Sequence, residues 1–389
     1  MKIAIVVPGR FHALELAAAL IARGHEVTVF TNYPPWAVRK FGLDPEHVRS
    51  IWPLGIVERA IARIIPERLL SRIWPFFQRT LGRWAARQLS REHFDVIHEF
   101  SGVGEEVIRA CSGDTKHLLM RASSHIRTQA EILRQEAERT GIALAEPSDW
   151  IIAREEREYA AADYVVVPAR FCRDSFVRQG VPEEKLLLLP FGVDTRKFTL
   201  SEEMIERRCR RILSGAPLTV LTTGQVSFRK GLYDYAKIAA RLDGRFRFRW
   251  IGFVREEAKN FITRLPGSVE LVPHLPQNSL PGVYAEGDLF LLPTVEDGFP
   301  YVLMQAYANS LPLLTTPHCS GPDIIHEGKT GWVLPVRDPE AFIDRLAWCD
   351  THREELAQMV RQMTRDFRSR DWSDVAADFE SLCEATTAV

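Results

Sequence analysis

The feature that most constrains the fold is a strand–loop–helix unit that opens the chain and returns near its middle. The apolar, β-branched run Lys2–Val7 ends at Pro8-Gly9, and a helical apolar pattern follows over Ala13–Arg23. Gly24 ends that helix, and a second β run covers Glu26–Thr31. Strand–helix–strand units build parallel sheets, so this opening predicts an α/β domain.

The second copy starts with a strand pattern at Leu218–Thr223, passes through a loop at 224–231 and enters a helical pattern at Leu232–Leu242. Helical stretches separate the other short apolar runs, as a doubly wound sheet requires. The sequence therefore predicts two Rossmann-like halves. The remaining predicted strands are Asp95–His98, His117–Met120, Tyr164–Val167, Leu186–Pro190, Phe246–Gly252, Val269–Val272, Leu289–Pro293 and Leu313–Thr315.

The length agrees with two domains, because 389 residues exceed what one ordinary hydrophobic core holds. Pro190-Phe191-Gly192-Val193-Asp194 and the charged stretch after it read as the linker. We predict a first domain over 1–195, a second domain over 196–370, and a C-terminal helix over 371–389 that returns to the first domain.

Composition excludes several classes of protein. The formal net charge of −1 argues against a dedicated nucleic-acid binder. No run of 18 uncharged apolar residues predicts a membrane-spanning helix, and the N-terminus lacks the long apolar core of a signal peptide. The six cysteines are scattered without metal-ligand spacing, so we expect reduced thiols in a cytoplasmic protein.

Two of the loops after predicted strands suit an anionic ligand, because ligands bind at the carboxyl ends of parallel strands. Gly9 allows close approach of backbone to a ligand, although a plain tight turn would also use glycine. Arg229 and Lys230 place adjacent cations before a helix, which favours a multivalent anion such as a diphosphate. A solvated basic turn is the alternative.

The third loop, at 296–306, combines polar side chains with a helix start. Asp297 lies just ahead of the predicted helix, and Gln305 lies about two turns inside it. This spacing puts both side chains beside amides that could hold phosphate. The alternative is that Asp297 simply caps the helix.

This loop resembles the E-x7-E region of retaining glycosyltransferases of family 4, which have the GT-B fold. Asp297-Gly298-Phe299-Pro300 is followed by Gln305-Ala306, as in the family pattern. The resemblance extends over nearly the whole chain, in the order of the family's motifs. The other motifs that resemble the family pattern are Arg23-Gly24-His25-Glu26-Val27, Ala162-Asp163-Tyr164 with Pro168, Pro190-Phe191-Gly192-Val193-Asp194 with Phe198, Arg229-Lys230-Gly231, and Gly328 with Gly331.

The resemblance implies transfer of a sugar from a nucleotide diphosphate sugar, with retention at the anomeric carbon. Its first domain would bind the acceptor and its second the donor. Arg229, Lys230 and the amides of Tyr301 and Val302 would bind the diphosphate, with Gly9 facing it. Asp297 would hold donor-sugar hydroxyls and Gln305 the ribose. His125 resembles the family's active-site histidine.

The chain departs from the family pattern at three positions. Aspartate and glutamine stand at 297 and 305, where the family has glutamates, and Gly224-Gln225 replaces a frequent Gly-Arg pair. Gln305 can hydrogen-bond a ribose but cannot supply charge or a proton. A mechanism in which the leaving phosphate accepts the acceptor's proton is unaffected. No D-x-D sequence occurs, so we expect no metal and no cofactor.

A local charge imbalance lies between residues 56 and 91, where eight arginines accompany two glutamates. Arg79, Arg83 and Arg87 recur at i, i+4 spacing, with Trp84 and other apolar residues between them, and Pro66 and Pro75 are expected to divide the stretch into shorter helices. Such a strip suits an anionic membrane or an anionic acceptor. The alternative is that its apolar side packs on the domain while the arginines are solvated.

Together these features predict a metal-independent GT-B glycosyltransferase that uses a nucleotide sugar, with UDP the expected carrier. We expect a lipid-linked or glycan acceptor, contact with the inner face of a membrane, and no nucleic-acid partner. Two alternatives stay open: a GT-B sugar-nucleotide epimerase and a non-catalytic nucleotide-sugar-binding protein.

Overall fold

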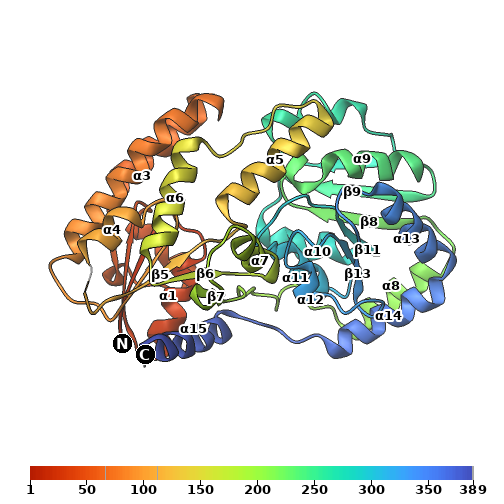
Figure 1. The fold of residues 1–389 in the computed structure, drawn as a ribbon. Helices are drawn as coiled ribbons and strands as arrows, with labels where there is room; N and C mark the ends of the chain where they lie inside the picture. The colour runs from red at the N-terminus through yellow and green to blue at the C-terminus, as the bar shows by residue number, and fades with distance from the viewer. Residues whose placement is uncertain (66, 112, 388–389) are drawn as a thin grey trace.

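Two parallel β-sheets form the framework of the protein (Figure 1). A computed structural model describes residues 1–65, 67–111 and 113–387. The seven-stranded sheet has the order β3-β2-β1-β4-β5-β6-β7 and the six-stranded sheet the order β10-β9-β8-β11-β12-β13. This confirms two Rossmann-like domains, since each sheet reverses its strand order beside its first strand, at β1/β4 and β8/β11.

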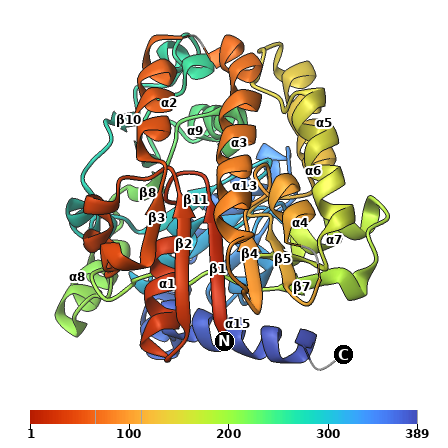
Figure 2. The same cartoon turned by 90° about the vertical axis from the view of Figure 1, so that its left-hand side faces the viewer.

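The central strands are mostly apolar and buried, because both faces of each sheet are covered by helices (Figures 1 and 2). All six residues of β8 are buried, for example. The first sheet comprises β1 (Lys2–Val7), β2 (Glu26–Thr31), β3 (Val48–Ser50), β4 (Val96–Glu99), β5 (Lys116–Met120), β6 (Tyr164–Val167) and β7 (Leu186–Leu188). The second comprises β8 (Leu218–Thr223), β9 (Phe246–Ile251), β10 (Val269–Val272), β11 (Leu289–Leu292), β12 (Leu313–Thr315) and β13 (Gly331–Val333).

The helices divide between the two sheets in chain order. Those with the first sheet are α1 (Ala13–Ala22), α2 (Trp52–Ile64), α3 (Glu67–Leu89), α4 (Glu105–Ala110), α5 (Ile126–Thr140), α6 (Asp149–Ala161) and α7 (Arg170–Arg178). Those with the second are α8 (Glu202–Leu213), α9 (Leu232–Arg241), α10 (Leu280–Ala285), α11 (Tyr301–Ala308), α12 (Gly321–Ile324), α13 (Pro339–Thr351) and α14 (Arg353–Asp366).

The last helix, α15 (Trp372–Thr387), crosses back under the first domain (Figure 1). Val375 and Phe379 are fully buried in the core that also contains α1. Arg23, the C-cap residue of α1, donates a hydrogen bond from Nε to the Glu380 carboxylate at 2.9 Å. The chain therefore crosses between the domains twice, at 190–198 and at 367–372.

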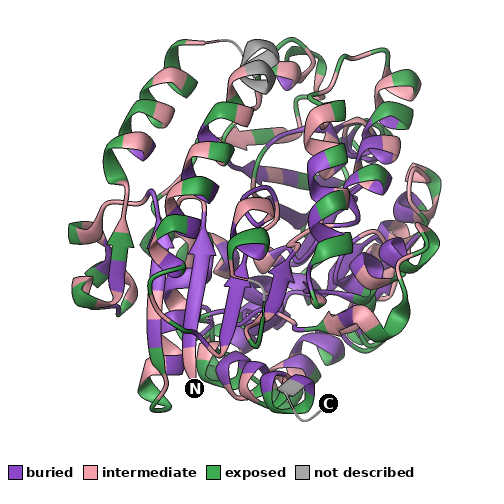
Figure 3. Cartoon of the chain, turned by 60° about the vertical axis from the view of Figure 1, so that its left-hand side comes forward, coloured by how far each residue is buried: buried purple, intermediate pink, exposed green. Residues whose placement is uncertain are grey.

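Helices α2 and α3 carry the arginine strip and stand side by side at one edge of the first domain (Figures 2 and 3). Arg79, Arg83 and Arg87 are exposed along one face of α3, and Phe76, 63% exposed, lies on that face as well. The side chains of Arg68 and Arg72, and Pro66, lie outside the described residues.

Two expectations for this region are wrong. Pro75 does not divide the stretch, because α3 continues through it. Trp84 does not share the arginine face: it packs against Phe30 with ring centroids 6.2 Å apart, at the edge of the domain core. Within the described part of the chain, no helix is long and apolar enough to cross a membrane.

Candidate active site

The loops that follow β8 and β11 lie against each other and position the central side chains of the site. Ser227 caps the short turn 228–230 by accepting a hydrogen bond from the Lys230 amide at 3.3 Å. The backbone carbonyl of Arg229 accepts from the Val295 amide at 3.0 Å and from the Thr294 hydroxyl at 3.0 Å. Gly231 has φ +83, and a side chain there would collide with the Pro293 carbonyl. Residues 229–230 are thus fixed beside residues 294–297.

Lys230 contacts Asp297 through an ion pair between Nζ and Oδ2. Burial, and then the neighbouring Arg229 guanidinium, lower the pKa of Lys230, so its positive charge depends on an anion beside it. Asp297 does not cap α11, whose N-cap position is Pro300. Its carboxylate pairs with Lys230 instead, so Asp297 is not simply the N-terminal cap of the helix.

Arg229 faces a different partner from Lys230. Its Nε donates to Glu296 Oε2 at 2.7 Å and to the Glu296 backbone carbonyl at 3.1 Å, and its Nη2 donates to Ser123 Oγ at 3.3 Å. It also lines a separate cavity of about 390 Å³, beside Gln129 and Gln225. The structure thus divides the predicted arginine–lysine pair between two carboxylates, Glu296 and Asp297.

Gln305 is held by a buried hydroxyl chain behind it. The Tyr284 hydroxyl donates to Gln305 Oε1 at 3.1 Å and lies 2.5 Å from the Thr223 hydroxyl. The Tyr284 hydroxyl takes one of the two acceptor positions of the amide oxygen and orients the amide, whose N–H groups can donate to a ligand. The sequence did not point to Tyr284 or Thr223, since nothing in their local pattern distinguishes them from core residues.

A cavity of about 940 Å³ lies between the two domains and is lined by Asp297, Tyr301 and Gln305 of the second domain. Its first-domain wall is formed by the loop after β1 and the start of α1, including Arg10, Phe11, His12 and Glu15. Segments 191–198 and 371–373, where the chain crosses between the domains, complete the lining. The cavity therefore has room for a nucleotide sugar with part of an acceptor.

The side chains around this cavity combine aromatic rings with cations. Phe191, Phe299, Tyr301 and Trp372 provide rings, and Phe191 lies 5.8 Å from Tyr301 between centroids. Arg10, Lys40, Arg196 and Lys197 provide positive charge. Among the described residues, no group of three or more His, Cys, Asp or Glu side chains could hold a metal ion.

Two of the remaining predicted site residues have clear structural roles. Gly9 has φ +71, a conformation that favours glycine, and its amide already donates to Asn32 Oδ1 at 2.5 Å. Val302 lies in the first turn of α11 and packs against the second-domain core. The first turn of a helix leaves backbone amides without intrahelical acceptors, and at α11 this turn adjoins the cavity through Tyr301.

His125 is not among the described residues that line the cavity. It is the N-cap of α5, and its Nδ1 accepts from the Arg127 amide at 3.2 Å. Its ring packs against Tyr159 and Phe176, with centroids 5.0 and 4.9 Å away. Burial lowers the pKa of His125 to about 4, so its imidazole is neutral. Its catalytic role stays a prediction.

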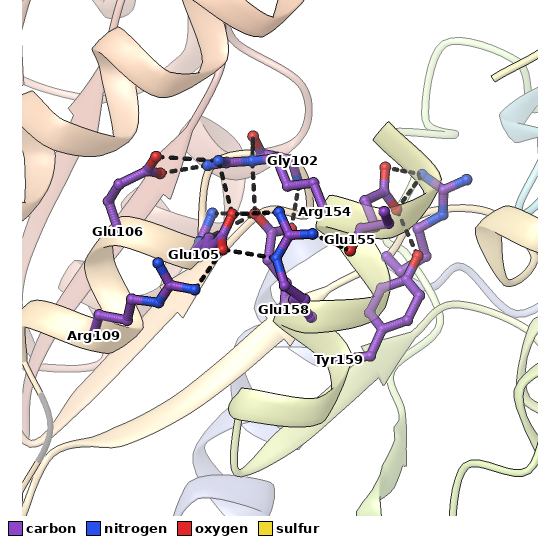
Figure 4. Close-up of polar contacts among 12 residues, drawn as sticks. Gly102, Glu105, Glu106, Arg109, Arg154, Glu155, Glu158 and Tyr159 are labelled. Atoms are coloured by element: carbon purple, nitrogen blue, oxygen red, sulfur yellow. Dashed lines mark hydrogen bonds and ion pairs between the residues drawn. The ribbon is translucent and has the colours of Figure 1, made fainter. Parts of the chain in front are cut away.

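A buried cluster of charges lies within the first domain (Figure 4). Glu158 accepts from the amides of Gly102, Gly104 and Glu105 at 2.6, 3.0 and 3.0 Å. Arg154, fully buried, pairs with Glu106 and lies 3.2 Å from Glu158. The cluster thereby fixes the loop after β4 onto α6.

Two family models match the chain, one for each domain. The model described as "Glycosyltransferase Family 4" matches residues 10–197, and the model described as "Glycosyl transferases group 1" matches residues 217–350. The putative colanic acid biosynthesis glycosyltransferase WcaL of Salmonella typhimurium is 26% identical over 210 residues, 51% of this chain and 50% of that protein. The chain thus spans about half the length of this curated relative.

Solved structures with the same fold cover the whole chain. Sucrose-phosphate synthase from Thermosynechococcus elongatus superposes with a TM-score of 0.71 at 16% identity, covering 100% of this chain and 99% of that one. Anabaena Alr3699/HepE, in complex with UDP and glucose, superposes with a TM-score of 0.68 at 13% identity, covering 100% of both chains. The first half of the chain thus matches the family 4 glycosyltransferase model and most of the second half matches the group 1 model, on a GT-B fold.

Proposed function

We propose that the protein transfers a sugar from a nucleotide diphosphate sugar, with UDP as the expected carrier, to a carbohydrate acceptor. The observation that carries the proposal is that Asp297, paired with Lys230, and Gln305 line one cavity between two Rossmann-like domains. A diphosphate needs a cation, a sugar needs a carboxylate, and a ribose needs an amide or carboxylate; these side chains supply all three.

Donor binding exchanges the partners of the ion pair. The diphosphate takes Lys230 as its counter-ion, and the freed Asp297 carboxylate accepts hydrogen bonds from donor-sugar hydroxyls. Gln305 donates its amide N–H groups to the ribose, and Tyr284 orients the amide through its oxygen. Arg229, already paired with Glu296, adds positive potential behind the phosphate, and the first-turn amides at Tyr301 and Val302 face its charge.

The transfer we infer proceeds with retention and without a metal. The bond between the anomeric carbon and the phosphate oxygen breaks, and the acceptor oxygen bonds to the same face of that carbon. The acceptor's proton passes to the leaving phosphate, whose developing charge Lys230 stabilises. This route needs no carboxylate at position 305 and is consistent with the neutral Gln305 and the neutral, buried His125.

For the acceptor we propose a lipid-linked or growing glycan. The name of the WcaL relative refers to colanic acid biosynthesis, which makes a polysaccharide acceptor a reasonable first choice. On the outside of the first domain, Phe76, 63% exposed, lies in α3 with Arg79, Arg83 and Arg87, and Ile64, 82% exposed, ends the neighbouring helix α2. Exposed apolar residues among arginines suit an anionic membrane surface, where such an acceptor would reside.

A donor panel tests the proposal. The protein is incubated with UDP-, GDP- and ADP-sugars, with and without EDTA and acceptor oligosaccharides, and nucleotide release and product anomers are followed by NMR. We expect slow donor hydrolysis for one donor, acceptor-dependent transfer with the donor's anomeric configuration, and no loss with EDTA. Acceptor-free interconversion of two nucleotide sugars would favour the epimerase, and donor binding without any turnover would favour the non-catalytic nucleotide-sugar-binding protein.

A further inference from the structure

A buried carboxylate next to Asp297 joins the two domains. Glu296 is 0% exposed. Its Oε1 accepts hydrogen bonds from the hydroxyls of Ser123 and Ser124 at 2.5 and 2.8 Å, and its Oε2 accepts from Gln129 Nε2 at 2.9 Å. These three donors belong to the first domain, whereas Arg229, 2.7 Å from Oε2, belongs to the second.

The charge of Glu296 is well compensated. Burial alone would raise its pKa, but Arg229 and the hydrogen bonds from Ser123, Gln129 and Ser124 outweigh it and lower the pKa to about 2. Hydrogen bonds to an ionised acceptor are roughly twice as strong as neutral ones. The contacts between the domains at this point are therefore strong ones, and they depend on one carboxylate.

The first-domain donors are themselves held in place. Arg121 donates to Gln129 Oε1 at 2.8 Å and to the Ser124 carbonyl at 3.0 Å. Arg121 in turn pairs with Glu155 at 3.0 Å, and Glu155 accepts from the Tyr159 hydroxyl at 2.5 Å (Figure 4). Because Arg121 takes the amide oxygen of Gln129, the amide nitrogen must face Glu296.

The backbones of the two domains also meet here. A Cβ at Gly298 would collide with the Ala122 carbonyl, so the loops 122–124 and 296–298 are in direct contact. Asp297, between Glu296 and Gly298, faces the large cavity and Lys230. A shift of Glu296 relative to Ser123 therefore moves the donor-binding carboxylate relative to the first-domain wall.

We propose that Glu296 is a positioning residue for the transfer: by taking donors from both domains, it holds them in the closed arrangement that aligns Asp297 and Lys230 with the acceptor side of the cavity. The inference rests on the proposed function. In this proposal Glu296 does not contact the substrate. The main role of Arg229 is to pair with Glu296, and its effect on the phosphate is secondary.

The variant Glu296→Gln, with Glu206→Gln on the surface as control, tests this. Glu206 also pairs with an arginine, Arg361, but away from the cavity. We expect Glu296→Gln to lower kcat by about tenfold or more, as for loss of a charge-assisted contact, with UDP affinity within about threefold of wild type. We also expect a larger radius of gyration in solution scattering and faster hydrogen exchange over 121–129.

A second variant keeps the test decisive if Glu296→Gln does not fold. Gln129→Ala removes a first-domain donor and leaves no unpaired buried charge on that side, and it should produce the same changes to a smaller degree. Unchanged scattering, exchange and kcat in a folded variant would overturn the proposal. Scattering and hydrogen exchange need no ligand. If the Glu296 variant shows the expected domain opening but the wild-type protein binds no nucleotide, the proposed function is contradicted and the role of Glu296 in joining the domains is not.

Discussion

The ammonium group of Lys230 is in direct contact with the carboxylate of Asp297, a residue that lines the cavity between the two domains. Each is held by its own loop, one after β8 and one after β11, and these loops are bonded to each other through the Arg229 carbonyl. The pair is thus built into the second sheet at its switch point, where α/β sheets bind their ligands.

The first prediction concerns the lysine. Lys230→Ala should weaken UDP binding by about 1.5–3 kcal/mol, the range for a hydrogen bond to a charged group. Titration calorimetry measures this directly. Lys329→Ala, an exposed lysine of the second domain, is the control and should bind UDP as wild type does. Equal affinity in both variants would remove Lys230 from the diphosphate site.

The second prediction concerns Gln305 and the tyrosine behind it. Gln305→Ala should weaken UDP binding more than Tyr284→Phe does, because the first removes the ligand contact and the second only its orientation. We expect about 0.5–1.5 kcal/mol for Tyr284→Phe, the net value of one hydrogen bond. The control is Tyr233→Phe, which leaves this hydroxyl chain intact. A larger loss in Tyr284→Phe than in Gln305→Ala would contradict the assignment.

The third prediction concerns pH and Glu296. Its folded-state pKa of about 2 lies below the ordinary value of 4.5, so its carboxylate stabilises the fold above about pH 4.5. This stabilisation, about 3 kcal/mol by linkage, is lost progressively as the pH falls toward 2. The difference in unfolding free energy between wild type and Glu296→Gln, from urea titrations at several pH values, should shrink accordingly. A difference independent of pH in this range would show that Glu296 is not ionised in the fold.

The fourth prediction concerns the exposed face of α3. Replacing Arg79, Arg83 and Arg87 by Gln should reduce pelleting with anionic liposomes, and high salt should do the same to the wild type. The control replaces three exposed arginines of the second domain, Arg207, Arg210 and Arg241, and so removes equal charge. If both triple variants pellet alike, the arginine face of α3 is simply solvated.

Much of the fold could be predicted because its strands are continuous apolar runs. Lys2–Val7, Tyr164–Val167 and Leu218–Thr223 begin and end where the sequence indicated. The strands β3 and β13 were missed, since three residues, with polar or glycine members such as Arg49 and Gly331, are too short to show a period. Pro75 was misjudged because a long amphipathic helix can continue through one proline when packing supports it.

The residues of the candidate site could also be predicted only in part. Asp297, Tyr301 and Gln305 line the cavity, as the rule about the carboxyl ends of strands indicated. Glu296 was overlooked, although an acidic residue directly beside Asp297 at the end of a strand was a usable signal. Its partner Gln129 could not be found, because their contact spans 167 residues of sequence and depends on how the two domains sit together.

The most direct test of the whole account is calorimetric titration of the wild-type protein with UDP, GDP and ADP. We expect saturable binding of at least one of these nucleoside diphosphates at one site per chain, with UDP binding most tightly. Absence of binding by all three, in a protein shown to be folded, would contradict the glycosyltransferase function and both of its alternatives.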